Sequence, residues 1–216
     1  MNLRNKVILV TGGGSGIGQQ LVLNLLLRGA TVAAADINEN GLNQTRLLAG
    51  ALADRLSLHK TDISDRGAVK ALADDIIGRH GHVDGIINNA GIIHRFEPVS
   101  ELGFDVIDRI INVNLHGVFN ITKAFLPHLK TRPEALIANI SSMGGLFAFP
   151  NQTIYGASKA AVKLFTAAIK IIQAIEKKRF RAHIGIDAKI LSFLYTLSPK
   201  YTILLISKAM KLVMGN

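Results

Sequence analysis

Apolar and polar positions follow two regular patterns along most of the chain. Short β-rich apolar runs such as "KVILVT" are followed by stretches such as "QQLVLNLLLRG", in which apolar residues recur at helical spacing. The predicted strands cover residues 6–11, 30–36, 55–62, 83–91 and 135–142; the predicted helices cover residues 19–29, the stretch from after residue 36 to about 50, and residues 64–80, 106–130 and 156–170. Ser64 is the expected N-cap of the third helix. Because strand and helix alternate throughout, the pattern predicts a parallel sheet covered by helices on both faces.

The composition fits a single globular domain over residues 1–216. Hydrophobic residues make up 49% of the chain, which excludes a disordered protein. The chain has no cysteine, so disulfides and thiolate metal sites are excluded; we predict no metal site and expect a reducing compartment such as the cytoplasm. The N-terminal apolar run is too short for a signal peptide. No stretch approaches the roughly 18 uncharged apolar residues of a membrane-spanning helix.

The formal net charge of +10 is concentrated toward the C-terminus. Residues 170–216 hold nine of the 25 Lys and Arg residues but only two of the 15 Asp and Glu residues. A solvated lysine-rich face is the favoured interpretation of this atypical basic part. Contact with an anionic membrane surface is an alternative, since apolar faces are interleaved with Lys there, and nucleic acid is a less favoured partner.

A glycine-rich turn follows the first predicted strand. Gly12, Gly16 and Gly18 stand where positive φ angles and the close approach of a pyrophosphate require glycine, and the N–H groups of the next helix face the anion. Asp36 ends the second strand, where its carboxylate would accept hydrogen bonds from a ribose 2′- and 3′-OH and repel a 2′-phosphate; Ile37 adds no positive charge. These features predict a dinucleotide site that favours NAD over NADP. The alternatives are an ordinary tight turn and, for Asp36, a helix N-cap.

The stretch "TGGGSGIG" has the spacing Gly-x-x-x-Gly-x-Gly and resembles the short-chain dehydrogenase/reductase family. Further motifs of that family follow in order: "NNAG" at residues 88–91, "NVNLHGVF" with Asn114, "ISS" with Ser142 and "YGASK" at residues 155–159. The resemblance covers roughly residues 5–168. It implies an α/β fold with a Rossmann-type doubly wound parallel sheet in three αβα layers, and an NAD(P)-dependent oxidoreductase.

By the same resemblance, loop and strand-end residues bind the cofactor. Asp62 meets the adenine edge with Ile63 packed beside it, while Asn88, Ala90 and Gly91 line the adenosine ribose and steady the central strand. The set is completed by Gly12, Ser15, Gly16, Ile17, Gly18, Asp36, Tyr155 and Lys159. From the residues alone, "NNAG" ends a strand at the carboxyl edge of the sheet, where open α/β sheets bind ligands; the alternative is an amide-rich turn.

Tyr155 and Lys159 stand four residues apart in a predicted helix and therefore share a face. A phenol ordinarily has a pKa of about 10. A neighbouring ammonium, together with the positive nicotinamide of NAD⁺, favours the phenolate and makes the tyrosine a usable acid or base. Ser142, at the end of the fifth predicted strand, can hold the substrate oxygen. The resemblance assigns to Asn114 a water that links the lysine to solvent.

The predicted reaction is therefore reversible hydride transfer between a small-molecule secondary alcohol and a ketone or aldehyde. Without the glycine loop, the Tyr–Lys pair would be interpreted as a surface pair and the serine as a cap. His94 and Arg95 either border the substrate or, as we favour, form a solvated loop. Phe147 and Phe149 either line an apolar pocket or pack in the core.

Near residue 168 the chain departs from the family. The sixth strand, the Pro-Gly turn and the substrate lid have no counterpart; instead, residues 171–180 predict a helix, 181–187 a strand, and 188–197 and 201–213 two further helices. We expect the polypeptide to contain an extra segment between about Ala168 and Ile172. If the chain is truly short, a catalytically inactive nucleotide-binding relative is the alternative.

A homo-oligomer is also expected from the resemblance, because the family associates through its fifth and sixth helices. The corresponding stretches, residues 106–130 and 156–170, carry apolar residues on more than one face. Examples are Val118, Phe119, Phe125, Val162 and Phe165.

Overall fold

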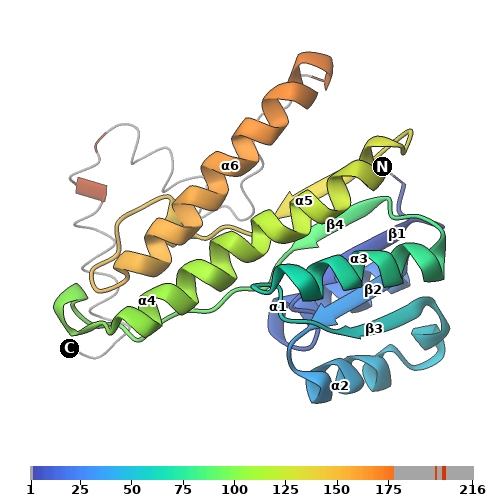
Figure 1. Ribbon diagram of the computed structural model, residues 1–216, viewed down its shortest axis with the longest axis horizontal. Coiled ribbons are helices and arrows are strands. Elements are labelled where there is room, and N and C mark those ends of the chain that lie inside the picture. The colour runs from blue at the N-terminus through green and yellow to red at the C-terminus, as the bar shows by residue number, and fades with distance from the viewer. Residues whose placement is uncertain (1, 178–197, 199–200, 203–216) are drawn as a thin grey trace. The chain divides into compact units, whose positions relative to one another are not determined.

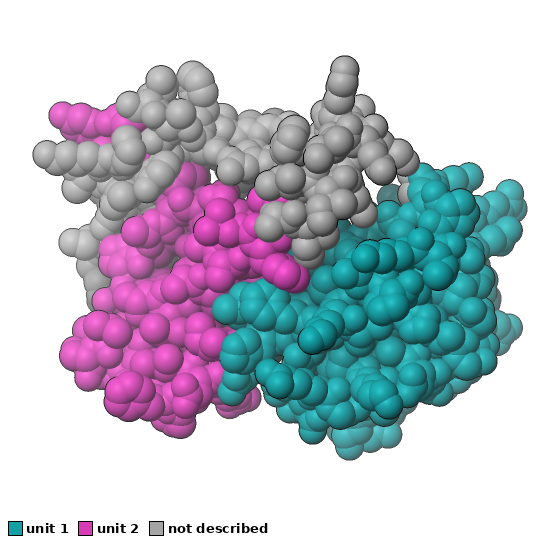
Figure 2. All heavy atoms as spheres, turned by 45° about the horizontal axis from the view of Figure 1, so that its top comes forward, with its two compact units in different colours: residues 1–91, 112–140 teal, residues 92–111, 141–216 magenta. Residues whose placement is uncertain are grey.

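The computed structural model describes residues 2–177, 198 and 201–202, which group into two compact units (Figure 2). The described residues of unit 1 fall within Met1–Gly91 and Asn112–Ile140, and those of unit 2 within Ile92–Ile111 and Ser141–Asn216. Of the helices that are described, none is both long and apolar enough to cross a lipid bilayer.

Unit 1 is built on a parallel sheet of five strands (Figure 1). The strands are β1 (Val7–Thr11), β2 (Thr31–Asp36), β3 (Leu56–Lys60), β4 (Gly85–Asn88) and β5 (Leu136–Asn139). They lie in the order β3-β2-β1-β4-β5, and each neighbouring pair is parallel. The helices between them are α1 (Gly16–Leu27), α2 (Glu39–Ala49), α3 (Arg66–His80) and α5 (Gly117–Lys130), with a short 3-10 helix, η1 (Gly50–Arg55), before β3.

The side chains of β1 alternate between two apolar layers because successive residues of a strand face opposite ways. Ile8 and Val10 belong to the cluster with α1 and α2, whereas Leu9 belongs to the cluster with α3 and α5, which run side by side in Figure 1. All three are fully buried, and each such burial contributes about 1.5–3 kcal/mol to folding. The predicted Rossmann-type sheet between two helical layers is confirmed.

β5 is an edge strand within the described residues, since it pairs only with β4. All five residues of β1 are buried, whereas all four residues of β5 are half-buried. The part of the chain that the structure describes contains no sixth strand beside β5.

Unit 2 contains the 3-10 helices η2 (Val99–Glu101) and η4 (Met143–Gly145) and the helices α4 (Phe104–Ile111) and α6 (Thr153–Lys177). α6 packs against α4 and η4. Its backbone is helical through residues 168–172, where an extra segment is predicted; that prediction stays open. The strand and the two helices predicted after residue 180 lie almost wholly outside the described residues.

Two helix predictions are corrected. The predicted helix over residues 106–130 begins earlier, at Phe104, and contains a π-helical turn, η3 (Asn112–His116), between α4 and α5. Ser64 is not the N-cap of α3. Its N–H and hydroxyl both donate to Asp62 Oδ1, at 2.8 and 2.7 Å, so the chain turns there and Asp65 becomes the cap that accepts from the first N–H groups of α3.

Candidate active site

The glycine loop joins β1 to α1 at the carboxyl edge of the sheet. Gly12 has φ of +70°, a conformation that L side chains rarely adopt, and a Cβ on Gly18 would collide with the Gly12 carbonyl. Ser15 is the N-cap of α1, but its side chain caps no N–H group. Ser15, Gly16 and Ile17 are exposed. The first turn of α1 therefore offers uncapped backbone N–H groups at an exposed loop, which suits an anion.

Asp36, at the end of β2, is bound to this loop. Its Oδ2 accepts a hydrogen bond from the Gly14 N–H at 2.9 Å, and its Oδ1 accepts one from the Asn38 N–H at 2.9 Å. The N-cap of α2 is Asn38, which accepts from the Gly41 N–H, so the alternative role of Asp36 as this cap is excluded. Carboxylate oxygens each accept more than one hydrogen bond, so Asp36 retains capacity for ribose hydroxyls.

Thr11 and Asn89, which the sequence did not indicate as site residues, connect the glycine loop to the end of β4 by hydrogen bonds. Thr11 Oγ1 accepts from the N–H groups of Asn89 and Ala90, both at 3.1 Å. The amide of Asn89 donates to the Thr11 carbonyl at 3.0 Å and to the Gly12 carbonyl at 3.4 Å. Asn89 is the second asparagine of "NNAG". Its position one residue past β4, at the carboxyl edge of the sheet, is the sequence feature that could have indicated its contact with the glycine loop.

Among the remaining predicted cofactor residues of "NNAG", Asn88 is buried and supports the sheet, whereas Ala90 and Gly91 are more exposed. Asn88 is 3% exposed, and its amide donates to Asn139 Oδ1 at 2.8 Å and to Thr122 Oγ1 at 3.2 Å, which ties β4 to β5 and α5. Ala90 is half-buried and Gly91 is exposed. Asn88 thus steadies the central strand, while Ala90 and Gly91 lie nearer the surface.

Asp62 and Ile63 follow β3 at the same sheet edge. Asp62 is half-buried, and its Oδ1 is engaged by Ser64. Ile63 is 6% exposed and belongs to the core layer of α3 and α5, and its carbonyl accepts from the Asn120 amide at 3.0 Å. The adenine contacts assigned to this pair stay a prediction.

Ser142 and Tyr155 lie beside Gly144 in unit 2, and the Lys159 ammonium lies near the Tyr155 ring. Ser142 Oγ accepts from the Gly144 N–H at 3.2 Å, and a Cβ placed on Gly144 would lie 3.4 Å from the Tyr155 ring and 3.7 Å from Ser142 Oγ. Lys159 Nζ lies 6.0 Å from the centre of the Tyr155 ring. The predicted sharing of one helix face by Tyr155 and Lys159 agrees with this geometry.

Lys159 is 5% exposed, whereas Tyr155 and Ser142 are half-buried. Burial lowers the pKa of the Lys159 ammonium below its ordinary value of 10.5. The Ser141 hydroxyl donates to the Lys159 carbonyl at 2.8 Å, which fixes the serine loop to α6. The group therefore combines the partly accessible Ser142 hydroxyl and Tyr155 phenol with the buried Lys159 side chain.

Asn114 lies in unit 1, in the π-helical turn η3, and is fully buried. Single π-helical turns within α-helices are frequent at functional sites. The water relay assigned to Asn114 stays a prediction.

Two expectations about the surroundings are corrected. His94 is 6% exposed, so it is not part of a solvated loop; its carbonyl accepts a hydrogen bond from Gln152 Nε2 at 3.1 Å, and Arg95 is exposed as predicted. Phe147 is buried at 3% exposure, in line with core packing, and Phe149 is half-buried.

The residues that suggested an oligomer are mostly covered by the chain itself. Val118, Phe125 and Val162 are buried within the single chain, so they need no partner. Phe119 and Phe165 are half-buried. The homo-oligomer stays a prediction, and its sequence argument now rests on fewer residues.

Comparison with known proteins gives the same family throughout. The sequence pattern of the short chain dehydrogenase family matches residues 6–177. SadH of Mycobacterium tuberculosis, named as an oxidoreductase, is 43% identical over 169 residues, which cover 78% of this chain and 61% of SadH. The 3-oxoacyl-[acyl-carrier-protein] reductase FabG of Thermotoga maritima is 36% identical over 162 residues, covering 75% of this chain and 65% of FabG. The matches thus span less than two thirds of either relative.

A solved structure has the same fold. The 3-ketoacyl-(acyl-carrier-protein) reductase of Brucella melitensis, crystallised with NADH, matches with a TM-score of 0.76 at 33% identity, covering 80% of this chain and 72% of that chain. The neighbour's ligand is a nicotinamide dinucleotide.

Proposed function

Since this chain belongs to the short-chain dehydrogenase family of oxidoreductases, we propose that it interconverts a secondary alcohol and a ketone or aldehyde with NAD as its cofactor. The observation that carries the proposal is the grouping in unit 2 of Ser142 and Tyr155 beside Gly144, with the Lys159 ammonium 6.0 Å from the centre of the Tyr155 ring. The uncapped glycine loop and Asp36 of unit 1 support it.

The residues of unit 1 fit a dinucleotide. Gly16 is exposed and has no atom within 4 Å of the position of a Cβ, so the loop backbone is accessible to a pyrophosphate, while Gly18 lets α1 pack against the Gly12 carbonyl. The Asp36 carboxylate accepts ribose hydroxyls and repels a 2′-phosphate, which favours NAD over NADP. When bound, the nicotinamide supplies the hydride chemistry that no amino-acid side chain provides.

The side chains of unit 2 handle the proton and the substrate oxygen. Because Ser142 Oγ accepts from the Gly144 N–H, its own O–H remains available to donate to the substrate oxygen. The Tyr155 phenol donates a proton to that oxygen when a carbonyl is reduced and takes it back when an alcohol is oxidised. The Lys159 ammonium stabilises the phenolate left behind. Burial lowers the pKa of Lys159, so it also releases its own proton more readily.

The Tyr155→Phe variant tests the proposal. It removes only the phenolic O–H, so NADH binding should persist while turnover of a panel of ketones and aldehydes, followed at the nicotinamide absorbance, falls about a hundredfold or more. Tyr201→Phe is the matched control, since Tyr201 is exposed and the chemical change is the same. A Tyr155→Phe protein with substantial turnover would refute the acid/base assignment.

The wild-type protein provides a second outcome. NADH binding without turnover of any compound in the panel would favour a nucleotide-binding relative that lacks catalytic activity. Failure to bind either NADH or NADPH would remove the cofactor assignment itself.

A further inference from the structure

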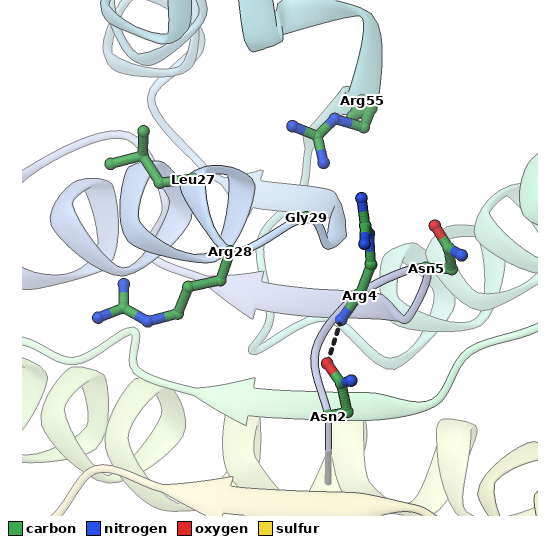
Figure 3. A pocket seen from close by; sticks show the side chains of 7 residues that line it. All are labelled: Asn2, Arg4, Asn5, Leu27, Arg28, Gly29 and Arg55. Atoms are coloured by element: carbon green, nitrogen blue, oxygen red, sulfur yellow. Dashed lines mark hydrogen bonds between the residues drawn. The ribbon is translucent and has the colours of Figure 1, made fainter.

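A cavity of about 600 Å³ that is open to solvent lies in unit 1 and is lined by three arginines (Figure 3). They come from separate segments: Arg4 precedes β1, Arg28 follows α1 as its C-cap, and Arg55 ends η1. The other lining residues are Asn2, Asn5, Leu27 and Gly29. No acidic residue is among them, so the cavity is lined by cationic and neutral groups alone.

The charges of these arginines are not neutralised within the described residues. None of the ion pairs there involves Arg4, Arg28 or Arg55. Arg28 Nη1 donates to the Asn24 carbonyl at 2.9 Å and to Asn24 Oδ1 at 3.0 Å, and Arg55 Nη2 donates to the Leu26 carbonyl at 3.0 Å. Each guanidinium has five N–H donors, so these bonds to α1 leave most of the donors available.

Arg4 is held in position by the backbone around it. Asn5 has φ of 61° and donates its N–H to the Gly29 carbonyl at 3.0 Å, and a Cβ on Gly29 would lie 3.3 Å from Arg4 Cγ. In Figure 3 the side chain of Arg4 extends toward that of Arg55. Two guanidinium groups that approach each other without an acid repel, and an anion between them relieves the repulsion.

We propose that this cavity is a second anion site, which takes the phosphate group of a small molecule. Guanidinium groups match phosphate oxygens with paired N–H donors, and the volume lies in the range of about 300–1,000 Å³ typical of small-molecule pockets. The cavity and the glycine loop lie at opposite ends of β1, whose five residues span about 17 Å. The two sites can therefore be filled at the same time.

Calorimetric titration of the full chain with pyrophosphate tests the site. The titration is done with and without saturating NADH, which would occupy the glycine loop. Arg4→Gln is the primary variant, because the Arg4 side chain forms no hydrogen bond or ion pair with a described residue and its loss leaves the fold intact. Arg66→Gln is the control, an exposed arginine at the start of α3 outside the cavity.

Wild-type protein should bind pyrophosphate, Arg4→Gln should weaken the Kd roughly tenfold or more, and Arg66→Gln should leave it unchanged. NADH affinity should be equal in all three proteins. Equal pyrophosphate affinity in wild type and Arg4→Gln, or no saturable binding to wild type at millimolar pyrophosphate, overturns the proposal. If NADH does not bind at all, the cofactor assignment fails. The comparison of Arg4→Gln with Arg66→Gln still decides whether the arginine-lined cavity is an anion site.

The phosphate could belong to a soluble ligand or to a lipid headgroup. Sedimentation with phosphatidylcholine vesicles, with and without phosphatidic acid, separates these sources. Cosedimentation that needs phosphatidic acid, is lost in Arg4→Gln and is displaced by pyrophosphate assigns the site to a headgroup. Pyrophosphate binding without cosedimentation assigns it to a soluble phosphate ester.

Discussion

The Asp36 carboxylate accepts a hydrogen bond from the Gly14 N–H at 2.9 Å and thereby connects the end of β2 to the glycine loop. The sequence predicts that this carboxylate recognises ribose hydroxyls and repels a 2′-phosphate. The structure adds a further role, since the carboxylate also supports the loop that is proposed to hold the pyrophosphate. Substitutions of Asp36 should therefore affect the binding of both the ribose and the pyrophosphate of the proposed cofactor.

We expect Asp36→Asn to weaken NADH binding roughly tenfold or more and to narrow the difference between NADH and NADPH. Loss of the charge weakens the hydrogen bonds to ribose, each worth about 1.5–3 kcal/mol, and removes the repulsion of a 2′-phosphate. Fluorescence titrations with both cofactors measure the effect. Glu39→Gln is the control, an exposed carboxylate in the first turn of α2. A wild-type preference for NADPH would contradict this role of Asp36.

Lys159→Met should lower kcat by about a hundredfold or more, because the ammonium that stabilises the Tyr155 phenolate is lost while the length of the side chain is kept. The matched control is Lys163→Met, one turn further along α6. Steady-state kinetics with the carbonyl panel gives kcat, and circular dichroism verifies the fold. Similar kcat values for the two variants would show that Lys159 has no special part in the reaction.

Asp84 joins the starts of β1 and β4. Its side chain is fully buried, and it accepts from the Val7 N–H at 3.0 Å and from Arg132 Nε at 2.9 Å, with His82 Nε2 at 3.2 Å. Burial raises the pKa of this carboxyl, but the hydrogen bonds from Val7 and Arg132 and the charges of Arg132 and His82 outweigh it and leave the pKa below the usual 3.8.

Asp84→Asn should lower the free energy of unfolding by about 3 kcal/mol at pH 7, since a buried charged acceptor is removed from its donors. A lowered pKa stabilises the fold fully above pH 3.8, and this contribution is lost as the pH falls through the folded-state value. The difference between wild type and variant should therefore shrink in acid. Urea denaturation measures it, with the exposed Asp74→Asn as control. A difference independent of pH would exclude the carboxylate as its source.

A partly buried chain of hydrogen bonds links β3 to α3. His59 Nδ1 lies 2.8 Å from Asp75 Oδ2, His59 Nε2 lies 2.8 Å from Ser57 Oγ, and Ser57 Oγ lies 2.9 Å from His80 Nε2. Burial lowers the pKa of His59 below 6.5, and Asp75 only partly offsets it. Burial and Arg79 lower the pKa of His80 in the same direction.

Acidification should therefore destabilise unit 1 through these histidines. Because both pKa values are lowered on folding, the unfolded chain binds protons more readily, and stability falls as the pH drops below 6.5 through the folded-state values. The double variant His59→Gln/His80→Gln should lose less stability between pH 7 and pH 5 than wild type does. His116→Gln, at an exposed histidine, should behave as wild type. Parallel pH profiles of wild type and the double variant would contradict the assignment.

The sequence determined the features that depend on consecutive residues. The strand and helix order, the glycine turn and the shared face of Tyr155 and Lys159 follow from periodicity and spacing, which the backbone geometry of a strand or helix translates directly into direction. Even so, the predicted N-cap of α3, Ser64, is wrong. The hydroxyl and N–H of Ser64 donate to Asp62, and Asp65 caps the helix instead.

Only the tertiary structure decided which distant groups meet. Asp36 and Gly14 are 22 residues apart, and the two asparagines of "NNAG" divided into one that binds β5 and one that holds the glycine loop. The burial of His94 and the placement of Arg4, Arg28 and Arg55 around one pocket likewise depend on how separate segments pack. Hydrogen bonds and charges act over a few ångströms in space, and the chain's local pattern carries no record of which remote segment will come within that range.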